Sequence, residues 1–179
     1  MKKTIISLLL LLSIAAGVFA QGYDVVEAGE EFDYKTDEVY LTVGTPSAVQ
    51  VLGAAFLVIF SLGTVDLEKQ GSSVPVSFTA GYNHYFCDNH LGVGGFASFE
   101  NSIFTLATVQ GKITGQYGWE HFKIYHSLSA GVLMTTGSAS FIADLTYLGL
   151  KFDFDDFNVF VEASFPSTAM VKIGASYKF

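Results

Sequence analysis

The last nine residues of the chain alternate between apolar and polar side chains without a break, and this pattern constrains the fold most strongly. Lysine, glycine and serine separate the apolar positions, which are Val171, Ile173, Ala175, Tyr177 and Phe179. A period of two belongs to a β-strand, because successive side chains of a strand point to opposite faces. The segment therefore predicts a strand with one apolar face and one polar face, running to the last residue.

Similar segments recur along the chain, and short runs of turn-forming residues separate most of them. The eight expected strands are residues 39–45, 74–86, 91–100, 105–117, 122–133, 141–154, 157–165 and 170–179. Strands joined by short turns pair as antiparallel neighbours. Apolar residues dispersed over strands of ~10 residues are typical of membrane barrels. We therefore expect an all-β fold, an antiparallel up-and-down eight-stranded transmembrane β-barrel.

A membrane barrel and a soluble barrel differ in whether the apolar faces of their strands point outward or inward. A soluble barrel would place its apolar faces inside, and a secreted soluble β-barrel that binds a small apolar ligand remains an alternative. The polar faces mix single lysines with Ser, Thr and Gln, whereas a solvated surface is usually richer in charge, so the membrane barrel is favoured. Charges on these faces then point into the lumen, where opposite signs neutralise each other. The expected lumen network comprises Glu100, Lys112, Lys123, Glu162 and Lys172.

One strand departs from regular alternation, around Leu148, Gly149 and Leu150. An extra residue in one strand of a pair forms a β-bulge and moves the following side chains to the other face. The sequence therefore predicts a bulge in this strand.

The beginning of the chain has the features of an export signal. Lys2 and Lys3 precede an apolar run that is shorter than the roughly 20 residues of a spanning helix, and small residues follow in the pattern of a cleavage site. We expect a signal peptide over residues 1–20, cleaved between Ala20 and Gln21. Residues 21–38 are acidic and are expected to form a lead-in to the barrel at 39–179.

A helix is predicted in the connection between the first two strands. Thr45 can cap it, Pro46 suits its first turn, and Gly63 follows its last turn. Residues 46–62 are apolar on nearly all sides but fall short of the ~18 residues of a membrane span. We expect a short helix packed at a mouth of the barrel or lying in the membrane interface.

The final strand resembles the carboxy-terminal signal by which the barrel-assembly machinery recognises outer-membrane barrels. Together with the export signal and the eight strands, it makes the chain resemble the small outer-membrane barrels of the OmpX and OmpA-barrel type. The resemblance implies a bacterial outer-membrane location, contact with outer-membrane lipid and a lumen filled by side chains. It leaves the role open, because such barrels include structural, adhesive and enzymatic members. The apolar helix is not part of the simplest of them.

Composition excludes several classes of function. The net charge is −8 and arginine is absent, which argues against nucleic-acid binding. The single cysteine, Cys87, cannot form an internal disulfide. No phosphate loop, dinucleotide motif or close pairing of the four histidines occurs, so no cofactor and no metal are expected.

A lipid A-modifying hydrolase is the enzymatic alternative, because some eight-stranded outer-membrane barrels carry a His, a Ser and an acidic residue on the lipid-facing wall. His126 and Ser127 invite the comparison, with Asp144 as an acid. Adjacent residues of a strand face opposite sides, however, so His126 and Ser127 diverge. We therefore assign no catalytic residue and expect a structural or interaction role, with the helix-bearing connection as its contact element.

Overall fold

The computed structural model describes residues 35–60, 76–101, 105–166 and 168–179, without the side chains of residues 57–60. These residues belong to one compact unit, Tyr34–Phe179. The expected signal peptide, its cleavage site at Ala20 and Gln21, and most of the acidic lead-in lie outside the described residues.

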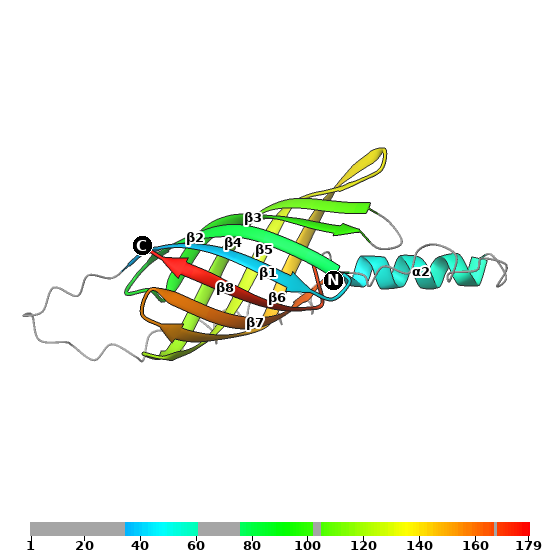
Figure 1. Ribbon diagram of the computed structural model, residues 1–179. Coiled ribbons are helices and arrows are strands. Elements are labelled where there is room, and N and C mark those ends of the chain that lie inside the picture. Colours follow the sequence, from blue (N-terminus) through cyan, green and yellow to red (C-terminus); the bar gives the residue numbers. More distant parts are fainter. Residues whose placement is uncertain (1–34, 61–75, 102–104, 167) are drawn as a thin grey trace, which may run out of the picture. The chain divides into compact units, whose positions relative to one another are not determined.

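The described residues form a closed barrel in which eight antiparallel strands follow chain order (Figure 1). The predicted fold class is confirmed, including one apolar helix in the first connection. The strands are β1 Asp37–Gly44, β2 Val76–Phe86, β3 Leu91–Asn101, β4 Thr105–Trp119, β5 Phe122–Thr135, β6 Ser138–Phe154, β7 Phe157–Phe165 and β8 Val171–Lys178.

Closure occurs between β1 and β8, which are far apart in sequence. Leu41 of β1 pairs with Ala80 of β2 on one side and with Ala175 of β8 on the other. Each strand thus has two hydrogen-bonded neighbours, and the sheet has no open edge. We call the end of the barrel where β8 finishes the turn end and the opposite end, where the helix begins, the helix end (Figure 1).

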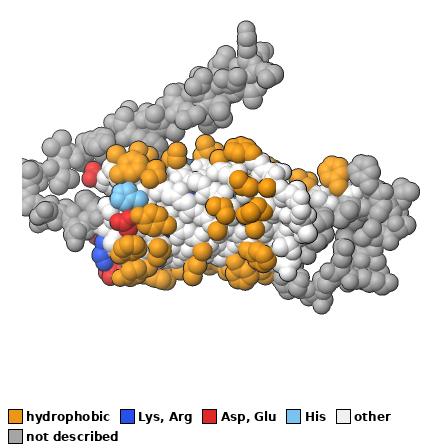
Figure 2. All heavy atoms as spheres, turned by 90° about the horizontal axis from the view of Figure 1, so that it is seen from above, with side chains coloured by type: hydrophobic (Ala, Val, Ile, Leu, Met, Phe, Trp, Pro, Cys, Tyr) orange, Lys and Arg blue, Asp and Glu red, His pale blue; other side chains and the backbone are white. Residues whose placement is uncertain are grey.

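The strands place apolar side chains outside and polar side chains inside. In β1, Glu38, Tyr40 and Thr42 are buried, whereas Leu41 between them is 68% exposed. The same alternation runs through the other strands, and Phe141 on the outer wall is 79% exposed. Figure 2 shows hydrophobic side chains gathered near the end that carries the charged groups, and again further along the wall. The arrangement is the inverse of a soluble barrel.

The helix α2 spans Ala48–Phe60 and begins two residues later than predicted. Ser47, and not Thr45, provides the cap, since the N–H of Gln50 donates to Ser47 Oγ at 3.3 Å. The Thr45 hydroxyl is instead occupied by the N–H of Val171, at 3.1 Å. No helix among the described residues is long and apolar enough to cross a membrane.

A bulge in β6 exchanges the two faces of that strand. The pairing registers of β6 with β5 and with β7 both shift at this point, the latter between Thr146 and Leu148. Thr146 before the shift is buried in the lumen, and so are Gly149 and Lys151 after it. The bulge thus lies at Tyr147, next to the predicted position, and it turns Lys151 inward.

Candidate functional site

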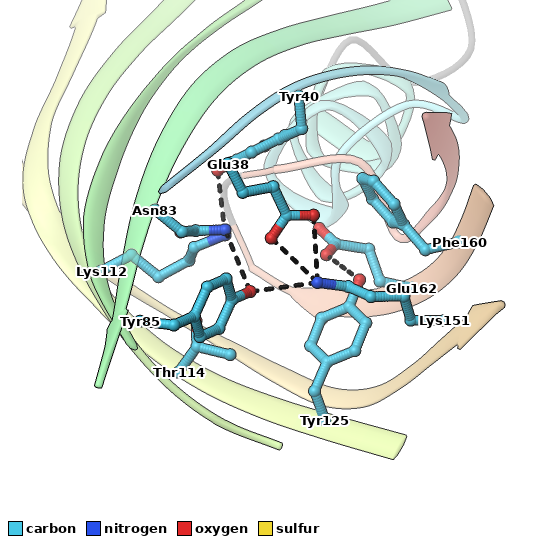
Figure 3. Close-up of a pocket in the computed structure, with 10 residues that line it drawn as sticks. All are labelled: Glu38, Tyr40, Asn83, Tyr85, Lys112, Thr114, Tyr125, Lys151, Phe160 and Glu162. Carbon is cyan, nitrogen blue, oxygen red and sulfur yellow. Dashed lines mark hydrogen bonds and ion pairs between the residues drawn. The ribbon is translucent and has the colours of Figure 1, made fainter. Parts of the chain in front are cut away.

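The interior of the barrel is the most densely organised polar region of the described chain. Its centre is an ion pair between Glu38 of β1 and Lys151 of β6, with Lys151 Nζ 2.9 Å from Glu38 Oε2 and 3.0 Å from Oε1. Lys151 also donates to the hydroxyl of Tyr85 at 3.1 Å, and Asn158 Nδ2 donates to Glu38 Oε1 at 3.3 Å. These partners come from four strands, and Figure 3 shows Glu38, Tyr85 and Lys151 pointing toward one another across the lumen.

A second ion pair lies in the same layer, between Glu162 of β7 and Lys172 of β8. The two residues stand directly opposite each other in the strand register. The Tyr125 hydroxyl donates to Glu162 Oε2 at 2.7 Å. Lys112 Nζ donates to the Tyr40 hydroxyl at 2.9 Å. Both acids of this layer are therefore matched by lysines, which offsets the cost of burying charge.

Four aromatic rings fill the space between these pairs, and they form the apolar core of the lumen: Tyr40, Phe96, Tyr125 and Phe160. Two glycines on the inner wall make room for the tyrosines. A Cβ atom built on Gly81 would lie 2.3 Å from the Tyr40 ring, and one on Gly149 would lie 2.2 Å from the Tyr125 ring. Larger residues at either position would displace a ring and the hydrogen bond that its hydroxyl makes.

The space left among these side chains is about 10 Å³, close to that of a single water molecule. Figure 3 shows the aromatic and charged groups converging on this space from the surrounding strands. The central layer therefore leaves no room for a solute, and its chemistry is that of a filled core and not of a binding cup.

A separate charged group closes the lumen at the turn end. Asp153 of β6 accepts from two lysines, Lys123 Nζ at 3.2 Å and Lys178 Nζ at 2.6 Å. Asp153 itself is buried, whereas both lysines are partly exposed. This group adds one acid and two bases to the interior.

At the helix end, the start of α2 enters the mouth of the barrel. The carboxylate of Glu100 accepts from the N–H of Ser47, at 3.0 Å and 3.2 Å. On the opposite side, Asp144 accepts from the N–H of Thr168 at 3.3 Å and from Gln110 Nε2 at 2.5 Å. Ser47 and Thr168 are buried, so the first turn of the helix and the segment before β8 fill this mouth.

All five predicted lumen residues point into the barrel, but they do not form one network. Glu162 and Lys172 pair with each other, and Lys112 lies in the same layer. Lys123 belongs to the turn-end group, and Glu100 holds the start of the helix. The sequence analysis did not identify five other residues that make many of the hydrogen bonds and ion pairs in the interior: Glu38, Tyr85, Tyr125, Lys151 and Asp153.

The five residues of the predicted insertion signal lie on the outer face of β8. Val171, Ile173 and Tyr177 are about half exposed, as is Phe179 just beyond the strand, whereas Ala175 is half-buried. Tyr177 and Phe179 stack on each other at the turn end, with ring centroids 6.4 Å apart.

The residues considered for hydrolase chemistry do not converge. His126 lies on the outer wall, where its ring nitrogens contact the Tyr147 carbonyl at 2.8 Å and the Tyr117 hydroxyl at 3.2 Å. Ser127 and Asp144 are buried inside the barrel. The described residues contain no group of three metal-ligating side chains.

Comparison with known proteins gives one match, to a solved structure. No protein-family model matches the chain, and no curated protein matches it. Among solved structures, the chain is similar to Ail, the attachment invasion locus protein of Yersinia pestis. The sequences are 15% identical, the match covers 80% of this chain and 97% of that chain, and the TM-score is 0.38.

Proposed function

We propose that this chain is an integral outer-membrane barrel with a structural or interaction role, and that its lumen is filled and not an open pore. The inverted distribution of polarity is the observation that carries the proposal. Large apolar side chains such as Leu41, Ile113 and Phe141 are mostly exposed, while charged and amide side chains are buried. Exposed apolar surface costs about 25 cal/mol per Å² in water, and lipid hydrocarbon removes that cost.

The placement of aromatic residues supports a membrane orientation along the barrel axis. Exposed aromatic side chains occur near both ends of the strands, and they include Tyr117, Trp119 and Phe154 at the turn end and Phe78, Phe99 and Phe165 at the helix end. Aliphatic residues such as Val109 and Leu128 occupy the wall between them. Outer-membrane barrels carry aromatic girdles at both interfaces with an apolar band between.

Heat-modifiability tests the membrane barrel. The chain folded in detergent should migrate differently on a gel before and after boiling, and its circular dichroism should be dominated by β-structure. No mobility shift, together with a folded chain that stays soluble without detergent, would contradict the proposal and favour a soluble β-barrel.

The filled lumen predicts that the protein does not conduct solutes. Eight strands enclose an interior that side chains fill, and the central layer of this barrel leaves about 10 Å³. Liposomes containing the heat-modifiable protein should show no faster swelling in sugar solutions than empty liposomes. Swelling at porin-like rates would contradict the filled lumen but would not contradict insertion of the barrel into the membrane.

The interaction role rests on α2 at the helix end. Its first turn is fixed in the mouth of the barrel, but Val51, Leu52 and Phe56 further along are exposed. We propose this helix as the contact element for a partner. A photo-crosslinking residue at Leu52 should give a discrete adduct in intact cells, whereas the same residue at Trp119 of the turn end should not give that adduct.

A further inference from the structure

A hollow of about 470 Å³ interrupts the outer wall of the barrel over β1 to β5. Its floor is made by three alanines, Ala80, Ala97 and Ala107, and larger side chains such as Phe78 and Phe99 surround them. The hollow is distinct from the lumen, because these residues belong to the outward-facing set of their strands.

The strand register explains why the wall is hollow here. Ala80 pairs with Ala97 across β2 and β3, and Ala107 pairs with Phe99 across β3 and β4. Directly paired side chains on one face lie about 5 Å apart, so the small residues adjoin one another and the bulky ones stand at their border. The bulky side chains project beyond the floor, which makes the surface concave.

A polar margin adjoins the hollow on the side of the helix end. Asn101 and Thr105 pair directly with each other, and the Thr105 hydroxyl donates to Asn101 Oδ1 at 3.3 Å. Asn101 stands two residues after Phe99, and Thr105 two residues before Ala107, so both share the outer face with the hollow. Both are exposed. An apolar hollow next to exposed polar groups matches a molecule with a hydrocarbon chain and a polar head.

We propose that the hollow binds one acyl chain of a membrane lipid, with the lipid headgroup at Asn101 and Thr105. The proposal rests on the proposed function, because the hollow must face lipid hydrocarbon. Between apolar surfaces in a membrane, close packing supplies the attraction, and a concave wall contacts a chain on more sides than a convex wall does. The projecting Phe78 and Phe99 would hold the wall of a second barrel away from the alanine floor, whereas a flexible chain can reach it.

Filling the hollow tests the proposal. The protein is reconstituted in dipalmitoyl phosphatidylethanolamine vesicles, extracted in mild detergent and examined by native mass spectrometry for retained lipid. Wild type should retain one lipid molecule per barrel. Ala97→Phe should reduce the retained fraction roughly tenfold, because the phenylalanine ring occupies the space that the acyl chain would fill. Ala143→Phe is the matched control, because Ala143 is an exposed alanine on the outer face of β6, away from the hollow.

Each other outcome identifies what has failed. If Ala97→Phe retains lipid like wild type, or if a heat-modifiable wild type retains none, the acyl-chain site is overturned and the membrane barrel stands. If the wild type shows no heat shift, the proposed function itself fails. Dimer masses that disappear in Ala97→Phe but persist in Ala143→Phe would assign the hollow to a contact between two copies and overturn the lipid site.

Discussion

At the scale of single residues, the buried ion pairs determine what the interior tolerates. Lys151 neutralises Glu38 in a pair whose side chains are almost fully enclosed. Lys151→Met should leave the Glu38 carboxylate buried and uncompensated, at a cost of about 3–5 kcal/mol in the free energy of unfolding. Urea unfolding in lipid vesicles would measure this loss.

Two variants give that measurement its controls. Lys35 pairs with Asp156 in an exposed position, so Lys35→Met should cost less than about 1 kcal/mol. Adding Glu38→Gln to Lys151→Met removes the uncompensated charge and should recover part of the stability. Equal losses for Lys151→Met and Lys35→Met would show that the central pair does not stabilise the barrel.

Residues near the middle of regular strands could be assigned to a face from the sequence, and others could not. Glu162 and Lys172 follow unbroken alternation, and the structure places both inside as neighbours. Glu38 lies at a strand beginning, which the acidic composition of the preceding residues obscured; β1 includes it. Glu38 and Lys151 become partners across the lumen only when the barrel closes. No local sequence pattern indicates that these two side chains will lie close together.

At the scale of elements, the bulge in β6 determines which face Lys151 and Asp153 occupy. Deleting Tyr147 removes the extra residue, so regular alternation from Thr146 keeps Lys151 and Asp153 in the lumen. Deleting Phe152 instead makes these two residues adjacent and puts them on opposite faces, so that one of them turns toward lipid, where a lysine costs about 2–4 kcal/mol near the bilayer midplane. We expect the Tyr147 deletion to retain the heat-modifiable form and the Phe152 deletion to abolish it. Both deletions shorten the strand by one residue; equal behaviour of the two variants would contradict the role of the bulge.

The start of α2 is the second element whose position depends on one side chain. Glu100→Leu removes the acceptor for the Ser47 N–H and leaves a buried donor unsatisfied, which costs about 1–3 kcal/mol. Amide hydrogen exchange at Ser47 should accelerate, while exchange in β4 and β5 should stay unchanged. Unaltered exchange at Ser47 would show that Glu100 does not hold the helix.

Element boundaries were predicted well where turn residues punctuate the strands and less well where tertiary contacts decide. The predicted bulge at residues 148–150 lies beside the observed one, because a break in alternation is a local signal. The helix was predicted to begin at Pro46, but the hydrogen bond between Thr45 and Val171 moves its start to Ala48. That contact joins segments 126 residues apart, so the sequence near the helix could not reveal it.

At the scale of the whole molecule, the closure of β1 on β8 differs from the other junctions among the described strands because these two strands do not follow each other in the chain. A turn fixes the alignment of the strands it joins, but here a slide of two residues would keep every side chain on its proper face. Such a slide would carry Glu38 away from Lys151 and Asn158, its partners across the lumen. The interior charges thus select one alignment of β1 with β8, because the ion pair and hydrogen bonds of Glu38 form only in that alignment. The alternation of polar and apolar residues alone would also allow the shifted alignment.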